Sequence, residues 1–424
     1  MSQTFVVHYS EVALKGKNRP EFARALTRNV KRALWGMNAT VSQSESRIFV
    51  EVDDREQEVA GRLSRVFGVS WFAPASSVPP EYESLRDATL KCAASLPGKT
   101  FRISARRSDK SFPMTSGELD RTLGSEVVGL TARPVDLSSP DATIHVDVLR
   151  RRALVYSART RGPGGLPVGT AGRTVHLFSG GIDSPVAAWL LMKRGCRPVY
   201  LHFHASPPGE NPMDGKVARL VKVLAGYCGK STLVLVPFAE YQIATMDAPG
   251  ELEPSLFRRF MRISAEALAP AFNASGISTG DSLSQAASQT LWNIRTFDEG
   301  SSLPVLRPLL TYDKEEIVSL AREIGTYELS LEEYKDCCSI VSRHPKTRAK
   351  AATVSEFATR LAFSDLAWKS FDQGTLISYD PERPEPKVLP LGDALRRAAS
   401  RDATPRPLAS RQDDMGSSHG KPEL

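Results

Sequence analysis

The stretch that most constrains the fold of this chain is TVHLFSGGIDSPVAAWLLMKRG, at residues 174–195. Residues 174–178 are a short run of apolar and β-prone side chains, which predicts a buried strand. From Val186 onward the apolar side chains recur at helical spacing, and Ser-Gly-Gly at 179–181 lies between the two elements. We therefore expect a strand, a tight loop and a helix, which is the start of an α/β unit.

The ends of that helix carry signals of their own. Asp183 and Ser184 are N-cap candidates, and Pro185 would then occupy the first turn, where its missing N–H costs nothing. Gly195 is typical of a C-terminal stop. The glycine-rich loop is therefore expected to lie directly against a helix N-terminus.

A loop of this kind binds anions. Its glycines allow successive backbone N–H groups to point inward, and the helix dipole adds partial positive charge. The hydroxyls of Ser179 and Ser184 can donate as well. We expect a phosphate or pyrophosphate as the ligand, and an ordinary strand–helix turn is the alternative. The spacing fits neither GxxxxGK[ST] nor GxGxxG.

SGGIDS resembles the PP-loop of the ATP pyrophosphatases, which split ATP between the α and β phosphates and activate a substrate oxygen as an adenylate. The resemblance implies ATP and Mg²⁺ as cofactors, with Asp183 helping catalysis at the magnesium–pyrophosphate end. No side chain is assigned to a resident metal site. By the same resemblance the loop residues that hold ATP are Ser179, Gly180, Gly181, Asp183 and Ser184.

The composition narrows the class of protein. A chain of 424 residues suggests two or three domains, and 41% hydrophobic with 24% charged residues is ordinary for a core-forming protein. We see no apolar run of about 18 residues and no secretory signal. The 5 cysteines are scattered without CxxC, which indicates a reducing, cytoplasmic location. A net charge of +7 suits a polyanionic partner.

The first 70 residues predict strand, helix, strand and helix, at 5–9, 20–34, 47–52 and 56–67. Lys15, Lys17 and Arg19 surround Gly16 and are candidates for phosphate contacts of tRNA, with a solvated basic loop as the alternative. SEVALKGKNRPEF closely resembles the N-terminal signature of the tRNA 4-thiouridine synthases. That family implies a ferredoxin-like domain, a THUMP RNA-binding domain and a PP-loop domain, in this order.

A Pro- and Ser-rich linker is expected at 71–80, followed by a second block. The block predicts helices at 85–96 and at 116–129 with Ser116 as N-cap, a strand at 101–107, and a hairpin of 143–149 with 153–158. FRISARRSDKSFPMTSGELDRTLG resembles the core of a THUMP domain. The basic side chains expected to meet tRNA here are Arg102, Arg106, Arg107 and Lys110, unless they form only a solvated surface.

A Gly- and Pro-rich linker at 160–172 leads into the PP-loop strand. Strands and helices then alternate, which predicts a doubly wound parallel sheet with helices on both faces. We expect strands at 198–204, 232–238, 276–280 and 305–309 and helices at 216–228, 255–269 and 313–325. Asp313 and Glu316 predict a capping box for the last helix.

Ligands of such sheets bind at the carboxyl ends of the strands. By resemblance the ATP contacts there are Leu177, Phe178, His202, Phe203, Arg258, Gly280 and Gln289. From the residues alone, His202 could equally be a core histidine, and Arg258 or Arg259 could form only an ion pair. The family usually has Gly where this chain has Ser284.

Cys337 and Cys338 follow a run that also resembles the family, LRPLLTYDKEEIVSLAREIGTYELS. The family places a catalytic cysteine here, because the adenylated oxygen needs a sulfur nucleophile. An ungapped match selects Cys337, and a match to Pro345 selects Cys338. A pair of inert buried thiols is the alternative. Cys196 and Cys228 lie within expected elements and are predicted to be packing residues.

Residues 347–424 are expected to be a partly disordered extension, with one helix at 357–371 and a disordered tail from about 399. Some family members end in a rhodanese domain with its own cysteine, and this stretch shows no such domain. Sulfur would then come from a separate persulfide donor, such as a cysteine desulfurase. The resemblance leaves open an accessory role in sulfur supply for thiamine thiazole synthesis, and a homodimer.

These expectations give domains at 1–75 (ferredoxin-like), 76–162 (THUMP) and 174–346 (PP-loop), with a linker at 163–173. The function implied by the resemblance is ATP-dependent conversion of uridine 8 of tRNA to 4-thiouridine. Two alternatives stay open. One is a PP-loop ligase for a small substrate, which would not need the basic N-terminal blocks. The other is a tRNA-binding protein without catalysis, which would not need the intact loop and the cysteine pair.

Overall fold

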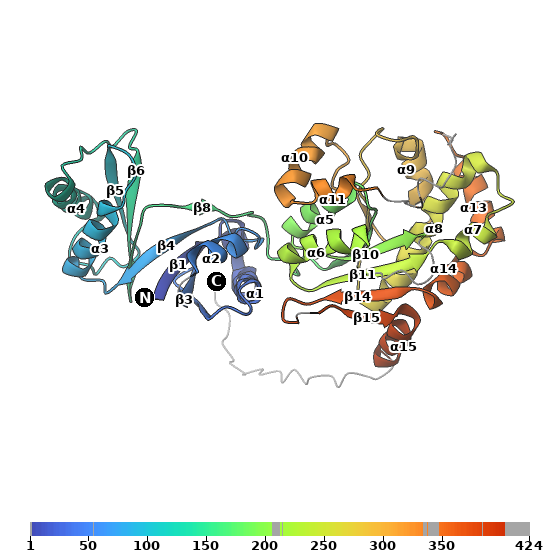
Figure 1. Cartoon of the computed structure of the whole chain (residues 1–424), viewed down its shortest axis with the longest axis horizontal. Helices are drawn as coiled ribbons and strands as arrows, with labels where there is room; N and C mark the ends of the chain where they lie inside the picture. Colours follow the sequence, from blue (N-terminus) through green and yellow to red (C-terminus); the bar gives the residue numbers. More distant parts are fainter. Residues whose placement is uncertain are drawn as a thin grey trace, which may run out of the picture.

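The computed structural model describes residues 2–53, 55–205, 213, 215–333, 337, 347–383 and 385–402. It has two halves, each built on one sheet (Figure 1). The N-terminal half has an eight-stranded sheet in the order β2-β3-β1-β4-β7-β6-β5, and β8 (Thr160–Arg161) also pairs with β4. The C-terminal half has a seven-stranded sheet in the order β13-β12-β9-β10-β11-β14-β15.

The first four strands and two helices confirm the α+β start of the chain. The strands are β1 (Ser2–His8), β2 (Ala39–Ser44), β3 (Arg47–Asp53) and β4 (Trp71–Val78), and the helices are α1 (Arg19–Ala33) and α2 (Glu56–Leu63). Two short 3₁₀ turns, η1 (Glu11–Leu14) and η2 (Gly16–Asn18), precede α1. Strand β2 was not expected, because it is an edge strand on which only Val41 is buried and so lacks an apolar alternation.

The linker expected at 71–80 is wrong, because most of it is strand β4. Residues 71–75 pair with β1 and residues 76–78 pair with β7, so β4 joins the two parts of the N-terminal sheet. Phe72 and Ala73 are fully buried in this strand. Pairing on both sides therefore outweighs the turn propensity of Pro74 and the serines.

The second block folds largely as expected. It comprises α3 (Tyr82–Ala94), β5 (Phe101–Arg107), α4 (Ser116–Thr131), β6 (Ala142–Val148) and β7 (Ala153–Tyr156), with β6 and β7 as the predicted hairpin. The N-cap of α4 is Thr115 and not Ser116, because Thr115 forms a capping box with Glu118.

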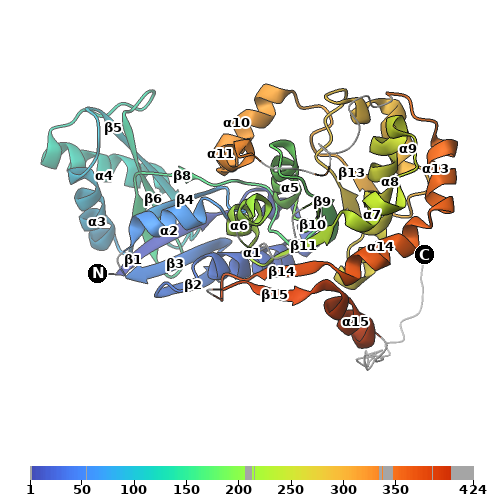
Figure 2. The same ribbon diagram turned by 45° about the vertical axis from the view of Figure 1, so that its right-hand side comes forward.

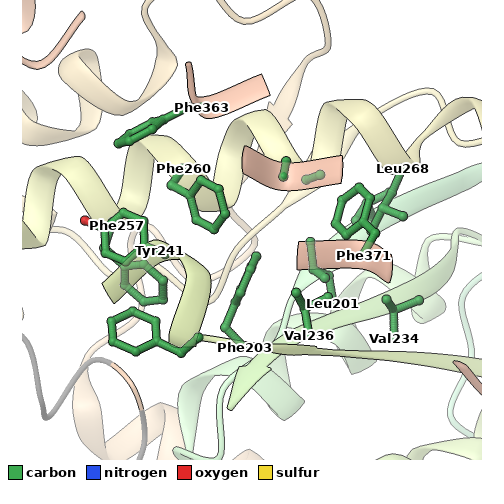
Figure 3. Close-up of a cluster of buried hydrophobic side chains, with 14 of the residues drawn as sticks. Leu201, Phe203, Val234, Val236, Tyr241, Phe257, Phe260, Leu268, Phe363 and Phe371 are labelled. Atoms are coloured by element: carbon green, nitrogen blue, oxygen red, sulfur yellow. The ribbon is translucent and has the colours of Figure 1, made fainter. Parts of the chain in front are cut away.

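The C-terminal sheet has five parallel strands: β13 (Val305–Leu306), β12 (Ile277–Ser278), β9 (Arg173–Leu177), β10 (Arg197–His204) and β11 (Ser231–Pro237). One face packs on α5 (Asp183–Lys193), α6 (Lys216–Cys228) and α10 (Lys314–Ile324). The other packs on α8 (Glu253–Leu268), as Figure 3 shows in close-up. The remaining elements before residue 333 are α7 (Ala239–Ala244), η3 (Gly250–Leu252), η4 (Pro270–Phe272), η5 (Ala287–Gln289), α9 (Leu291–Asp298) and α11 (Tyr327–Leu331).

The C-terminal extension is part of this half, contrary to expectation. One helix was predicted at 357–371, but α13 (Ala351–Arg360) and α14 (Phe363–Asp372) are separate, because Ala362 between them adopts φ 46°. Strands β14 (Thr375–Tyr379) and β15 (Lys387–Pro390) extend the sheet antiparallel, and α15 (Leu391–Asp402) follows. The tail expected to be disordered lies outside the described residues beyond 402.

The two halves are in direct contact. Arg194 at the end of α5 donates twice to the carboxylate of Glu11, at 3.0 and 2.7 Å. The buried ring of Phe67 packs edge-on against Trp189 of α5, with the ring centroids 5.1 Å apart. These contacts fix the N-terminal half against the helix that begins at the glycine-rich loop.

Candidate active site

The loop at 179–184 connects β9 to α5, as predicted. Ser184 holds it closed, because its Oγ accepts from the backbone N–H of Ser179 at 3.2 Å and donates to the carbonyl of Leu177 at 3.3 Å. The N-cap of α5 is Ile182, without a side-chain cap, so the prediction that Asp183 or Ser184 caps the helix is wrong. Ser184 instead ties the helix to the strand, and Asp183 is the first helical residue.

His176, a buried histidine on β9, contacts the C-terminal end of this loop. Nε2 of His176 lies 3.0 Å from the carbonyl oxygen of Ser184, so it carries the ring proton, because a carbonyl only accepts. Nδ1 lies 2.9 Å from Oγ of Ser278 on β12. Burial lowers the pKa of His176 to about 4, so the ring is neutral at physiological pH. The sequence analysis did not predict a role for His176.

Asp183 is the charged side chain of the loop at 179–184. Its Oδ1 accepts from Nζ of Lys314 at 2.7 Å, and its Oδ2 accepts from Nε2 of Gln285 at 3.1 Å. The side chains of Asp183 and Lys314 are 23% and 48% exposed, so solvent and ligands can reach both. The sequence analysis did not identify Lys314 as a site residue. The predicted capping box of Asp313 and Glu316 is confirmed, and it could have indicated that Lys314 lies in the first turn of a helix.

Gly280 lies directly against the start of α5. A Cβ atom on Gly280 would stand 2.9 Å from both Cα and N of Ser184, so only glycine fits. After it, Ser284 adopts φ 63°, a left-handed conformation in which glycine carries no penalty. This chain therefore has Ser where the family usually has Gly, at a position where the left-handed backbone conformation is unfavourable for any residue with a side chain.

Arg258 belongs to a buried ionic cluster. It donates to both carboxylate oxygens of Asp281 at 3.0 and 2.8 Å, and Arg307 donates to the same carboxylate at 3.2 Å. Burial opposes ionisation of Asp281, but the two guanidinium groups outweigh it and hold the pKa of Asp281 below its usual value. Arg259 pairs instead with the carboxylate of Glu299 at 2.8 Å.

The strand-end residues lie beside the loop but are mostly buried. Nδ1 of His202 donates to the carbonyl of Phe178 at 2.8 Å, and both residues are almost fully buried. The ring of Phe203 points into the cluster around Phe257 and Phe260, as Figure 3 shows, so it is not exposed for base stacking. Phe203 could meet a ligand only through its backbone.

One candidate thiol lies near the same strand end. The Sγ of Cys337 donates to the carbonyl of Phe203 at 3.2 Å and is 1% exposed. Cys338 lies outside the described residues. Cys196 and Cys228 are buried within their half, and burial raises the pKa of both thiols, in keeping with the packing role expected for them.

The described residues fit a nucleotide with its magnesium ion in two respects. Oε1 of Gln289 is buried without a hydrogen-bond partner among the residues that the structure describes, and the cradle formed by Gly280 against Ser184 has no room for a side chain. Among the described residues no cluster of three His, Cys, Asp or Glu side chains forms a protein-only metal site. Asp183 is thus a single carboxylate at the loop, which suits an ion held mainly by phosphates.

The two sets of basic residues expected to meet tRNA lie apart. Lys15, Lys17 and Arg19 lie at η1–η2 and the start of α1, on the side facing the C-terminal half, whereas β5 lies at the far end in Figures 1 and 2. On β5, Arg102 donates to Oγ1 of Thr143 at 3.2 Å, and Arg106 is exposed. Arg107 is tied to the carbonyl of Phe112 at 2.9 Å, and Lys110 is exposed.

An aromatic and cationic group that the sequence did not reveal lies on the N-terminal sheet. The guanidinium of Arg159 stands 4.5 Å from the ring centroid of Trp71, which in turn stacks on His8 at 3.9 Å. Burial, together with Arg47, Arg159 and Arg106, lowers the pKa of His8 to about 3. These residues come from five separate segments, so only the folded sheet brings them together.

No helix among the described residues is both long and apolar enough to cross a bilayer. Three family models match the chain in order: the ThiI ferredoxin-like domain at 4–73, the THUMP domain at 82–158 and the thiamine biosynthesis protein (ThiI) at 169–363.

Curated relatives and a solved structure resemble nearly the whole chain. A probable tRNA sulfurtransferase of Moorella thermoacetica is 41% identical, over 90% of this chain and 99% of the relative. One from Thermus thermophilus is 40% identical, over 89% and 95%. The crystal structure of a 4-thiouridine synthetase–RNA complex with bound ATP matches with a TM-score of 0.82 at 30% identity, over 90% of this chain and 100% of that one. The chain therefore belongs to the ThiI family of tRNA sulfurtransferases.

Proposed function

We propose that this enzyme uses ATP and Mg²⁺ to adenylate O4 of uridine 8 in tRNA and replaces that oxygen with sulfur, giving 4-thiouridine. The observation that carries the proposal is that the glycine-rich loop and the thiol of Cys337 both lie at the carboxyl ends of two neighbouring strands. Strand β9 ends at Leu177 and leads into the glycine-rich loop, and its neighbour β10 pairs Leu201 with Leu177. Two residues further along β10, the carbonyl of Phe203 accepts from the thiol of Cys337.

The loop and its surroundings supply positioning and charge. The loop 179–184 would hold the phosphates at the N-terminus of α5, as other loops at helix N-termini do, while the N–H of Ser179 and the hydroxyl of Ser184 keep the loop closed. Asp183 helps hold Mg²⁺ at the pyrophosphate end, and Lys314 beside it neutralises developing negative charge. Contacts to ATP from Leu177, Phe178, His202, Phe203, Arg258, Gly280 and Gln289 belong to the same proposal. Of these, Gln289 brings a buried side-chain carbonyl oxygen that no described residue hydrogen-bonds.

The reaction then balances in two halves. O4 of the uridine attacks the α phosphorus and pyrophosphate leaves. The terminal sulfur of a persulfide on one cysteine attacks C4, and AMP leaves with the original oxygen. A second thiol breaks the S–S bond that still joins protein to RNA, and an external thiol reduces the resulting disulfide. Cys337 and Cys338 are the candidates for these two roles.

The partners follow from this chemistry. The basic residues at 15–19 and 102–110, with Arg159 and Trp71, are proposed to hold the tRNA backbone and its unpaired end. Persulfide sulfur is proposed to come from a separate donor such as a cysteine desulfurase, in the cytoplasm. A homodimer and a contribution to thiamine thiazole synthesis are further parts of the proposal.

The test combines the protein with Mg-ATP, a cysteine desulfurase, cysteine and unmodified tRNA, and reads 4-thiouridine by its near-ultraviolet absorbance. We expect product from the wild type and from Cys196→Ala, a matched control for loss of a buried thiol. Asp183→Ala, and at least one of Cys337→Ala and Cys338→Ala, should lose product. The cysteine variant that stays active identifies the dispensable thiol.

Other outcomes point elsewhere. ATP turnover that ignores tRNA would favour a ligase for a small substrate. If tRNA binds but ATP is never consumed, the protein is a tRNA-binding protein without catalysis. If tRNA-dependent ATP turnover occurs without 4-thiouridine, adenylation stands and the assumed sulfur donor is wrong.

A further inference from the structure

The loop that contacts Asp183 ends in an exposed aromatic surface. Gln285, whose side chain donates to Asp183, is followed by the short turn η5 and then by α9. The first two residues of α9, Leu291 and Trp292, are 67% and 54% exposed. Leu291 and Trp292 together form a contiguous exposed apolar surface, and such surfaces can mark interaction sites.

The same surface is tied to the segment that follows the cysteines. Oγ1 of Thr290 donates to the carbonyl of Thr347 at 2.8 Å, and the backbone N–H of Ala349 donates to Oδ1 of Asn293 at 3.1 Å. The guanidinium of Arg348 stands 6.0 Å from the ring centroid of Trp292. Trp292 therefore lies on a surface formed by two segments: the one that follows Gln285, and residues 347–349, which come after the candidate thiols in the chain.

The charge around the ring is positive. Arg295, one turn further along α9, is exposed, as are Arg348 and Lys350. Within the described ranges none of these three cations forms an ion pair. The acids that end α9 are engaged elsewhere, because Asp298 accepts from Arg307 at 2.6 Å and Glu299 pairs with Arg259. The surface thus combines a stacking ring with unneutralised cations, as surfaces that bind unpaired nucleotides do.

We propose that Trp292 stacks on an unpaired base of the tRNA substrate, with Arg295 and Arg348 on the flanking phosphates, and so positions the reacting nucleotide at the rim of the ATP site. The inference rests on the proposed function and deepens it by naming a substrate contact. Charge favours RNA over a protein partner here, because three exposed cations that form no ion pair with any described residue lie on α9 and on the adjacent segment 348–350. An attacking uridine must leave its stack to reach the loop, and an aromatic side chain at the rim compensates for the lost stacking.

The test compares Trp292→Ala and Trp292→Phe with Trp368→Ala. Trp368 is a matched control, because it is 49% exposed on α14 in the same half of the molecule, and α14 lies across α8 from α9 in Figures 1 and 2. Measurements are the Kd and KM for tRNA, the Kd for ATP, and the quenching of tryptophan fluorescence by tRNA. Base stacking corresponds to a loss of about 5- to 140-fold in tRNA affinity on substitution by alanine.

We expect Trp292→Ala to weaken tRNA binding within that range while ATP binding stays as in the wild type. Trp292→Phe should recover most of the affinity, and tRNA should quench less fluorescence in that variant than in the wild type. Arg295→Ala should weaken tRNA binding. It should also reduce the slope of log affinity against log salt concentration by about one, as expected for the loss of one phosphate contact.

Equal tRNA affinity in Trp292→Ala and Trp368→Ala would overturn the inference. So would a parallel loss of ATP affinity, which would mark Trp292 as structural. Trp292→Ala could instead keep wild-type tRNA affinity and turn over more slowly only when the desulfurase supplies the sulfur. That result would overturn the inference and assign the surface to binding of the desulfurase. A wild type that binds tRNA but makes no 4-thiouridine refutes the proposed function, and the affinities still decide the role of Trp292.

Discussion

Nζ of Lys314 lies 2.7 Å from Oδ1 of Asp183, although the two residues are 131 positions apart in the chain. Each is the first residue of its helix, Asp183 in α5 and Lys314 in α10. A lysine at a helix N-terminus opposes the helix dipole, whereas an aspartate there is favoured. The ion pair with Asp183 therefore offsets the unfavourable position of Lys314 at a helix N-terminus. It also brings the N-terminal ends of α5 and α10 close to the loop.

We expect Lys314→Ala and Asp183→Ala to lower ATP-dependent turnover by about 100-fold or more, because in the proposed function Lys314 neutralises charge on the phosphates and Asp183 helps hold their magnesium ion. The measurement is kcat and kcat/KM for tRNA-dependent pyrophosphate release. Lys369→Ala is the matched control, since Lys369 pairs with Glu240 at 2.6 Å on the surface of the same half. Turnover of Lys314→Ala equal to that of this control would show that Lys314 serves only as a surface ion-pair partner.

Gly280→Ala should weaken ATP binding, because the new Cβ would stand 2.9 Å from the backbone of Ser184 and displace the start of α5. Gly250→Ala is the control, as no atom lies within 4 Å of a Cβ built there. Calorimetric titration with ATP measures the change, and circular dichroism confirms that both variants fold. Wild-type ATP affinity in Gly280→Ala would mean that α5 can shift without cost to the site.

Ser284→Gly should keep activity and raise the free energy of unfolding slightly, by about 0.5 kcal/mol. Glycine relieves the strain of φ 63°, and the greater freedom of glycine in the unfolded chain offsets part of the gain. Ser284→Val should lower it by about 1 kcal/mol or more, since a β-branched residue tolerates this conformation least. Urea denaturation gives both values, and a glycine variant less stable than the wild type contradicts the argument.

His176→Gln should make stability less sensitive to acid. The pKa of His176 is about 4 in the folded protein against an ordinary value of 6.5, so between these pH values only the unfolded chain binds the proton. The free energy of unfolding therefore falls as pH is lowered through this window, by up to about 1.4 kcal/mol per pH unit from this residue.

Glutamine keeps a donor for the carbonyl of Ser184 and does not titrate. Urea midpoints at pH 7.5 and pH 5 measure the difference between the two proteins. His8, His145 and His204 also have lowered pKa values, so the variant should retain part of the slope. Identical slopes in wild type and variant would show that His176 does not titrate in this window.

Local signals in the sequence predicted most elements and the nature of the site. The bounds of β5 and α6 agree with expectation to the residue, because apolar periodicity and flanking turns coincide there. The loop at 179–184 was identified because glycines, hydroxyls and a helix start are contiguous in the chain. These features depend on neighbours a few residues away, which a single sequence displays.

Only the tertiary structure decided which distant residues meet. It turned the supposed linker at 71–80 into a strand shared by two sheet parts, and it added β14 and β15 to the C-terminal sheet. It also set Lys314 against Asp183, His176 beneath Ser184, and Trp292 beside Arg348. Strand pairing and side-chain contacts of this kind gain their free energy from partners far along the chain. No local propensity encodes those partners, so the fold alone shows them.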